Sequence, residues 1–214
     1  MKGRWFYAAG GLAAVIVVAV YLGFAGGNHG MSARPAAVKE GTAASDRVRS
    51  FSLTDTGGTI VTDRSFKGDW LIVFFGFTHC ADICPAALFK LSRALEALGD
   101  PAARVRVAFV TVDPDRDSPQ VLHSYLQAFG PRFIGLTGTQ EQISATEKTF
   151  RAYAEKQAKA ANGGYGMNHS SAFYVLDPNG RFRRQISAES TIEDLAASLR
   201  RAMSLNTTVE GVSN

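Results

Sequence analysis

The residues of this sequence best suited to chemistry are its two cysteines, Cys80 and Cys84. They follow a run of apolar residues and precede Pro85, a pattern that predicts the start of a helix directly after a buried strand. Side chains four positions apart on a helix lie on one face, with Cβ atoms about 5–6 Å apart, so the two sulfurs could bind one metal ion or form a disulfide. The partial positive charge at the helix amino terminus is expected to lower the pKa of both thiols, because it stabilises the thiolate. Metal binding and thiol exchange both need the thiolate.

A pair of thiolates favours a soft metal ion, and an imidazole added to the pair gives a ligand set that suits copper. Structural zinc fits less well, because it usually has four protein ligands. Two other interpretations stay open: a buried or disulfide-linked pair that only packs, and a dithiol that cycles with its disulfide. The four-residue spacing alone does not separate them, because it also recurs by chance in helices.

The elements that would position the cysteines follow the order of an α/β protein. Residues 70–77 form a continuous apolar run rich in aromatic and β-branched residues, which predicts a central strand buried on both faces. After the cysteines, leucines recur at three- and four-residue spacing as far as Gly99, which predicts an amphipathic helix. The sequence further predicts a β-hairpin at 51–61, strands at 105–112 and 133–136, helices from Ser118 to about Gly130 and from Thr139 to about Tyr153, an exposed loop at 154–167, strands at 171–176 and 181–186, and a closing helix from Thr191. This order indicates a mixed sheet flanked by helices, resembling thioredoxin.

The amino terminus predicts a single transmembrane helix. No Asp, Glu, Lys or Arg occurs from 5 to 33, and the apolar part, about 6–25, has the ~20 residues that a helix needs to cross a bilayer. Lys2 and Arg4 precede it, which predicts a cytoplasmic amino terminus and an exported domain. A cleaved signal peptide is the alternative, since small residues follow the apolar run. We expect an anchor at 1–25, a flexible linker at 26–47, a domain at 48–203 and a tail at 204–214, with the anchor in the inner membrane and the domain in the periplasm or the equivalent intermembrane space.

The composition bounds the class of protein. The 214 residues are 46% hydrophobic and 20% charged, enough for one folded domain, which we expect to be monomeric. The net charge of +4 comes from basic and acidic residues spread along the chain, so no segment is typical of nucleic-acid binding. Two cysteines are too few for the disulfide framework of a small secreted domain.

Longer segments around these residues resemble the Sco (SenC) family. Residues 74–85, FFGFTHCADICP, are similar to the family's FGFTHCPDVCP, and residues 110–119, VTVDPDRDSP, to its SVDPERDTP. FIGLTGT at 133–139 and His169 with its two following serines match further family motifs, so the resemblance covers about 51–199. Ala81 departs from the proline that the family usually has after the first cysteine, a change that could alter redox poise without removing a ligand.

This resemblance implies a function. In the family, the two cysteines and the downstream histidine bind copper, which assigns the ligands to Cys80, Cys84 and His169. The family's thioredoxin-like domain serves assembly of the CuA centre of cytochrome c oxidase. The implied cargo is a copper ion, and the implied partner is a copper-receiving oxidase subunit or another copper chaperone.

Asp113 is the acid best placed to support these ligands. It ends a predicted buried strand, at the sheet edge where α/β proteins place ligand sites, so it could orient His169 or a cysteine. The alternative is that Asp113, Asp115 and Asp117 solvate a turn and cap the helix that follows. His169 follows a Gly-rich stretch, 163–168, and a loop there could bring its imidazole to the cysteines.

The remaining candidates are weaker. His79 could bind the metal or tune the neighbouring thiolate, although a supporting or structural role fits it better, because adjacent residues rarely face one metal. Met167 could offer a thioether ligand or pack against apolar surface. We interpret His123 as a surface residue on a helix and His29 as part of the linker.

Three functions compete. The first is a copper metallochaperone, the second a thiol-disulfide reductase that keeps the cysteines of a copper-receiving partner reduced, and the third a peroxidase with a resolving cysteine. The reductase does not need His169, because thiol exchange uses no imidazole ligand.

Overall fold

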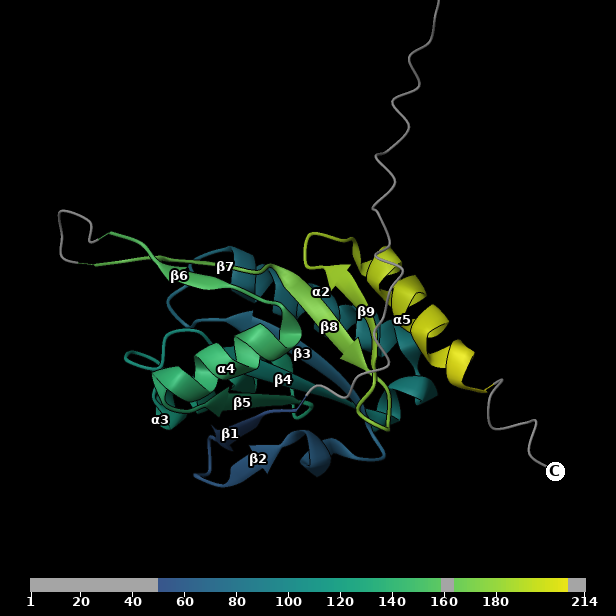
Figure 1. The fold of residues 1–214 in the computed structure, drawn as a ribbon. Coiled ribbons are helices and arrows are strands. Elements are labelled where there is room, and N and C mark those ends of the chain that lie inside the picture. Colours follow the sequence, from purple (N-terminus) through teal and green to yellow (C-terminus); the bar gives the residue numbers. More distant parts are fainter. Residues whose placement is uncertain (1–49, 159–163, 208–214) are drawn as a thin grey trace, which may run out of the picture. The chain divides into compact units, whose positions relative to one another are not determined.

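The structure, a computed structural model, describes residues 50–158 and 164–207 (Figure 1). Its elements are, in chain order, β1 Ser52–Asp55, β2 Ile60–Thr62, the 3-10 helix η1 Asp63–Phe66, β3 Trp70–Gly76, α2 Ile83–Leu98, η2 Asp100–Arg104, β4 Val105–Thr111, α3 Pro119–Leu126, η3 Gln127–Phe129, β5 Phe133–Thr137, α4 Gln140–Phe150, β6 Ala154–Lys156, β7 Met167–His169, β8 Ala172–Leu176, β9 Phe182–Ser187 and α5 Ile192–Thr207. This order reproduces the predicted hairpin, the alternating strands and helices, and the late second hairpin.

One seven-stranded sheet organises the described residues, in the strand order β2-β1-β5-β4-β3-β8-β9. β4 lies parallel to β3 and β5, whereas β8 runs antiparallel to β3, and β1 runs antiparallel to β5. The sheet is therefore mixed, as predicted, and β1 with β2 forms the predicted amino-terminal hairpin. Because β3 lies between β4 and β8, the turn that follows β3 leaves the sheet near its middle.

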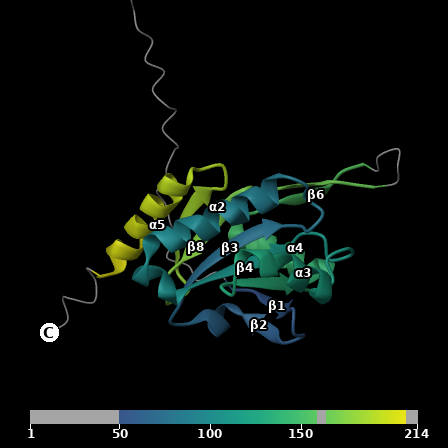
Figure 2. The ribbon, with the colours of Figure 1, turned by 180° about the vertical axis from the view of Figure 1, so that it is seen from behind.

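Helices cover both faces of the sheet. α2 and α5 lie together on one face, where Arg200 of α5 donates to the carbonyl of Ala97 in α2 (Figure 2). η3, which follows α3, joins this face, since the Ser92 hydroxyl of α2 donates to the Phe129 carbonyl. α4 covers the opposite face (Figure 1). This arrangement is the thioredoxin-like mixed sheet flanked by helices that the sequence predicts.

Local sequence signals set the ends of the helices. The Ser118 hydroxyl caps α3 by accepting from the Val121 N–H, and Pro119 is the first helical residue. α4 begins with the predicted capping box of Thr139 and Gln142. α2 is capped at its carboxyl end by Gly99, whose φ of 68° is readily adopted only by glycine.

Aromatic side chains fill the core on both sides of β3. All seven residues of β3 are buried, because both faces of the strand are covered, as its apolar run predicts. Phe74 packs against Phe109, with ring centroids 6.1 Å apart. Phe75 points to the other face and packs against Phe150 of α4, with ring centroids 5.7 Å apart.

The segment 154–167 differs from its prediction as an exposed loop. β6 and β7 at its two ends pair antiparallel, with Ala154 opposite His169 and Lys156 opposite Met167. Two three-residue strands of largely polar sequence offer no pattern long enough to predict a strand. His169 is therefore the last residue of a paired strand, and we refer to β6 and β7 together as the ribbon.

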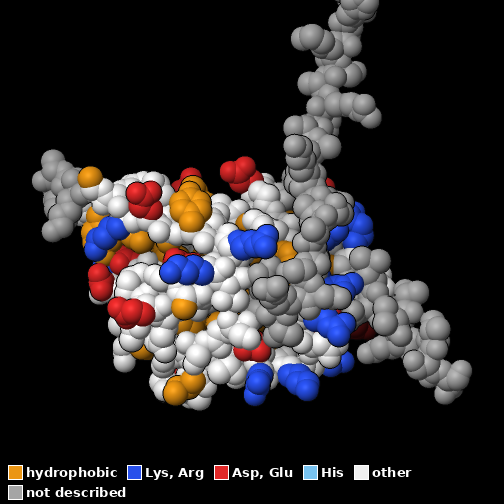
Figure 3. Space-filling view, in the orientation of Figure 1, with side chains coloured by type: hydrophobic (Ala, Val, Ile, Leu, Met, Phe, Trp, Pro, Cys, Tyr) orange, Lys and Arg blue, Asp and Glu red, His pale blue; other side chains and the backbone are white. Residues whose placement is uncertain are grey.

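The predicted anchor at 1–25 and linker at 26–47 lie outside the described residues. Within 50–158 and 164–207, no helix combines the length and the apolar character that a bilayer crossing requires. On the face seen in Figure 3, lysine and arginine side chains are spread among acidic ones.

Candidate metal centre

The structure brings Cys80, Cys84 and His169 together. The two Sγ atoms and an imidazole nitrogen lie within 4.8 Å of one another. The Cys84 Sγ is 3.5 Å from His169 Nε2. Metal bonds of about 2.3 Å to sulfur and about 2.0 Å to nitrogen set three ligand atoms around one ion roughly 4 Å apart. The group could therefore close on one metal ion with small side-chain movements.

Cys80 lies in the turn between β3 and α2, not on the helix. α2 begins at Ile83, and the Cys84 N–H donates to the Cys80 Sγ at 3.3 Å. The predicted placement of both cysteines on one helical face is therefore wrong for Cys80. Its sulfur instead accepts one of the free amides at the helix amino terminus. It is also the more exposed of the two thiols.

Cys84 lies in the first turn of α2, and its side chain is fully buried. Burial raises the pKa of its thiol well above the usual range, and a hydrogen bond with the Phe77 backbone opposes this only in part. The prediction that the helix terminus lowers the pKa of both thiols is therefore wrong for Cys84. This thiol therefore keeps its proton at neutral pH, and a metal ion would have to displace that proton to bind the sulfur.

Two phenylalanine rings hold the imidazole of His169. Phe74 and Phe77 meet it edge-on, with ring centroids 6.2 and 5.8 Å away. Burial lowers the pKa of the imidazole, which favours its neutral form. Nδ1 lies 3.1 Å from the Ser170 carbonyl. Since a carbonyl only accepts, this contact favours the tautomer with the proton on Nδ1, in which the Nε2 lone pair is left for Cys84.

The wall of the site beside Cys84 is tightly packed. A Cβ on Gly76 would lie 2.8 Å from a ring carbon of Phe109 and 3.1 Å from the Cys84 Sγ, so only glycine fits here without displacing a neighbour. Tyr125 packs on Phe109 with ring centroids 5.7 Å apart, and its buried hydroxyl has no hydrogen-bond partner among the described residues. Burial and the nearby cysteine sulfurs raise the pKa of this phenol, so it stays protonated.

Asp117 supports the turn that carries Cys80, a role that the sequence interpretation missed. Its fully buried carboxylate accepts from the Thr78 N–H at 3.0 Å, the Thr78 hydroxyl at 2.6 Å and the Thr111 hydroxyl at 2.6 Å. These bonds join the turn after β3 to the end of β4. One signal was available: Ser118 already supplies the cap of the next helix, which leaves Asp117 free for another role.

Asp113 is also buried, but its carboxylate does not bind His169 or a cysteine, the partners predicted for it. It accepts from the Tyr165 hydroxyl at 2.8 Å and from the Arg116 guanidinium. Among the described residues, no hydrogen bond joins this carboxylate to His169 or to a cysteine. Any support that Asp113 gives to the ligands is therefore indirect.

His79 and Met167 lie at the margin of the site. The His79 side chain is 52% exposed, and its Nδ1 is 3.8 Å from Asp117 Oδ1. This position suits a supporting contact with the turn. Met167 is partly buried and packs against the core. This is the second of the two roles considered for it, packing against apolar surface.

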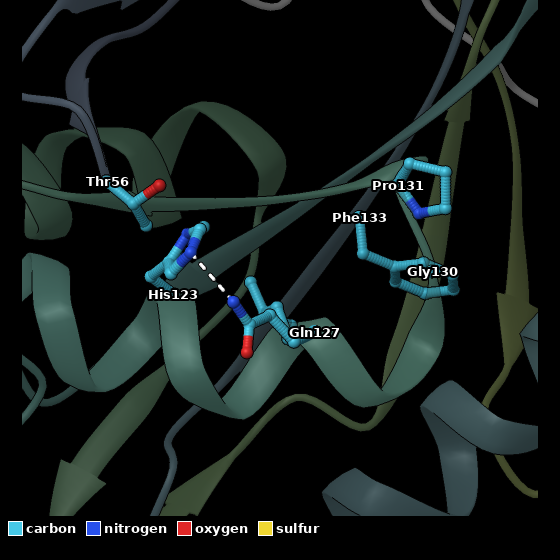
Figure 4. A pocket seen from close by; sticks show the side chains of 8 residues that line it. Thr56, His123, Gln127, Gly130, Pro131 and Phe133 are labelled. Atoms are coloured by element: carbon cyan, nitrogen blue, oxygen red, sulfur yellow. Dashed lines mark hydrogen bonds between the residues drawn. The ribbon is translucent and has the colours of Figure 1, made fainter.

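A separate hollow of about 390 Å³ lies beside α3 (Figure 4). The side chains of His123 and Gln127 are 3.0 Å apart there, and Thr56 and Phe133 also line the hollow. None of the three predicted metal ligands lines it. His123 is exposed, as predicted for a surface residue.

Comparisons with known proteins identify relatives of the chain. The SCO1/SenC family model matches residues 39–204. Protein sco1 of Schizosaccharomyces pombe is 41% identical over 152 residues, which are 70% of this chain and 58% of that protein. The structure of Bradyrhizobium japonicum ScoI with copper bound has 40% identity and a TM-score of 0.64, over 72% of this chain and 97% of that one. BsSco, a member of the Sco family of cytochrome c oxidase assembly proteins in which a disulfide switch was identified, has 27% identity and a TM-score of 0.57, over 74% of this chain and 94% of that one.

The chain belongs to the SCO1/SenC family, as its motifs predict. The thioredoxin-like fold is confirmed by the same structural similarity. The match spans less than two thirds of the length of the sco1 relative. Similar Sco proteins hold copper in their structures, and the group of two cysteines and one histidine found here could hold a metal ion.

The different surroundings of the two thiols predict different reactivity. In the reduced chain, iodoacetamide at pH 7.5 is expected to modify Cys80 at least about tenfold faster than Cys84, because the latter is buried and its pKa is raised. Peptide mapping by mass spectrometry after timed quenching measures both rates. Cys80→Ser serves as the control and removes the fast phase; equal rates, or faster modification of Cys84, would contradict this description of the site.

The buried contacts of Asp117 predict a stability loss. Asp117→Asn replaces one accepting oxygen by a donor and leaves a buried donor unpaired, so the free energy of unfolding is expected to fall by roughly 1–3 kcal/mol. Asp115→Asn is the matched control, because the Asp115 side chain is 75% exposed. Urea unfolding of the reduced chain measures both. Similar values for the two variants would show that the three hydrogen bonds of Asp117 contribute little.

Proposed function

We propose that this chain is a copper-binding metallochaperone that delivers copper for assembly of the CuA centre of cytochrome c oxidase. The observation that carries the proposal is the convergence of two sulfurs and one imidazole nitrogen within 4.8 Å. This soft ligand set suits copper. The similar ScoI protein has copper bound in its structure. Copper is the cargo in this function, and Cys80, Cys84 and His169 are its proposed ligands.

The unequal exposure of the sulfurs suggests the order of transfer. Cys80 is the more accessible, so an incoming donor would pass copper to this sulfur first. Cys84 then loses its proton, and His169 Nε2 completes a three-coordinate site. A three-coordinate ion has room for a further ligand. A ligand of the acceptor can therefore enter and replace the ligands of this chain one at a time.

We also propose where the domain works. Residues 1–25 would anchor the chain in the inner membrane, with the linker at 26–47, the domain at 48–203 in the periplasm or the equivalent intermembrane space, and the tail at 204–214. The support is the uncharged apolar segment preceded by Lys2 and Arg4. A monomeric domain on such a linker could reach an oxidase subunit or another copper chaperone at the membrane.

A thiol-disulfide reductase is the second candidate function. Both cysteines are free and their sulfurs lie within 4.8 Å, and a disulfide switch is identified in the similar BsSco. A thiolate of Cys80 would attack a partner disulfide and form a mixed disulfide, releasing one partner thiol. Cys84 would then lose its proton and attack the Cys80 sulfur, leaving an oxidised domain and a second partner thiol. This step needs no metal ion.

Anaerobic Cu(I) titration of the reduced chain tests the copper function. One ion per chain is expected, and His169→Ala is expected to weaken binding by more than about 100-fold, beyond the 10–100-fold effect of residues that only support a ligand. Cys80→Ser and Cys84→Ser are expected to do the same, because each removes one of three ligands. His123→Ala is the matched control, since that histidine lies in the separate hollow beside α3.

The same variants separate the two functions. Reduction of a disulfide peptide by His169→Ala at the unchanged rate, with loss in both serine variants, would support the reductase alongside copper binding. Unchanged copper affinity in Cys80→Ser or in His169→Ala would refute the proposed three-ligand site.

A further inference from the structure

The ribbon that carries His169 is too small to hold its own position. Each of its strands has three residues, and an isolated two-stranded hairpin is at best marginally stable in water. The last residue of the ribbon nevertheless places its imidazole 3.5 Å from the Cys84 sulfur. The imidazole itself packs against Phe74 and Phe77, and contacts of the segment beside the ribbon can further fix this geometry.

Tyr165, two residues before β7, makes such contacts. Its hydroxyl donates to Asp113 Oδ1 at 2.8 Å, and its carbonyl accepts from the Arg116 guanidinium at 3.0 Å. The same guanidinium lies over the Tyr165 ring, 3.6 Å from its centroid, and the Lys156 ammonium lies over the ring at 3.9 Å. Cations so close to an aromatic ring are attracted by its quadrupole. Tyr165 is thus held by its ring, its hydroxyl and its backbone.

Arg116 connects this tyrosine with the metal centre. Its Nε donates to Asp113, and its guanidinium lies 5.7 Å from the centroid of the Phe77 ring. The Phe77 ring in turn meets the imidazole of His169 at 5.8 Å. One guanidinium nitrogen, Nη2, is buried without a hydrogen-bond partner among the described residues. An unpaired buried donor is unfavourable, so the other contacts of this side chain must hold it in place.

We propose that Arg116 and Tyr165 are positioning residues, which hold the ribbon so that His169 Nε2 faces the Cys84 sulfur. In the described structure, neither forms a hydrogen bond with a proposed ligand, so both act through the ribbon and through Phe77. The inference rests on the proposed copper function. Without either side chain, the imidazole occupies the ligand position for only a fraction of the time, and the apparent copper affinity falls by that fraction.

A double-mutant cycle on Cu(I) affinity tests this role, measured with the reduced full-length chain against a competing chelator. Tyr165→Ala is expected to weaken binding at least about tenfold, within the 10–100-fold range of residues that orient a ligand. In the His169→Ala background, the same change is expected to have no further effect, because the group on which Tyr165 acts is absent. Arg116→Ala is expected to behave in the same way.

Two further variants separate positioning from general stability. Tyr165→Phe keeps the ring under the two cations and is expected to recover most of the lost affinity. Tyr153→Ala removes a tyrosine side chain that is 57% exposed directly before β6, and is expected to leave the affinity unchanged. Circular dichroism checks the fold of each variant, and the Tyr165 variants decide the outcome should Arg116→Ala not fold.

The possible failures are distinguishable. An affinity loss in Tyr165→Ala that persists in the His169→Ala background would overturn the positioning role, and so would the absence of any loss. A wild-type chain that binds no copper would instead overturn the copper function itself.

Discussion

The approach of the Cys84 sulfur to His169 Nε2, at 3.5 Å, is the contact on which the rest of the site depends. It brings a thiol from the start of α2 against an imidazole from the end of β7, and Gly76 leaves the space that the sulfur occupies. Burial shifts both groups toward their neutral forms, because it raises the pKa of the thiol and lowers that of the imidazole. A neutral thiol facing a neutral imidazole leaves no unpaired charge inside the protein, so the metal-free site costs little to maintain. A metal ion that displaced the thiol proton would convert this contact into two of the proposed ligands.

Two carboxylates of the turn after β4, Asp113 and Asp117, support the segments on either side of this contact: the turn between β3 and α2, and the ribbon. Asp117 accepts three hydrogen bonds and holds the turn that presents Cys80. Asp113 holds the other segment, because it binds both Arg116 and Tyr165 on the way to the ribbon. The turn after β4 is therefore linked to both sides of the proposed metal centre. The mixed sheet makes this possible, since parallel β3 and β4 end at the same edge.

The sequence was sufficient for the parts of the fold with long or specific patterns. The apolar run of β3, the leucine spacing of α2 and the capping residues Ser118 and Thr139 all predict the elements that the structure contains. The ribbon could not be predicted, because strands of three residues carry no periodicity. Neither the departure of Cys80 from the helix nor the raised pKa of Cys84 is visible in sequence spacing, since both depend on how the turn packs. The meeting of His169 with cysteines far away in the chain was implied by family resemblance alone.

The coordination of bound copper decides whether this contact becomes a metal site. X-ray absorption at the copper edge, on the reduced chain loaded with one equivalent of Cu(I), measures it. We expect a first shell of two sulfurs and one imidazole nitrogen, with the nitrogen contribution lost in His169→Ala. A shell of sulfur alone, or an imidazole signal that survives in His169→Ala, would contradict the ligand set proposed for this chain.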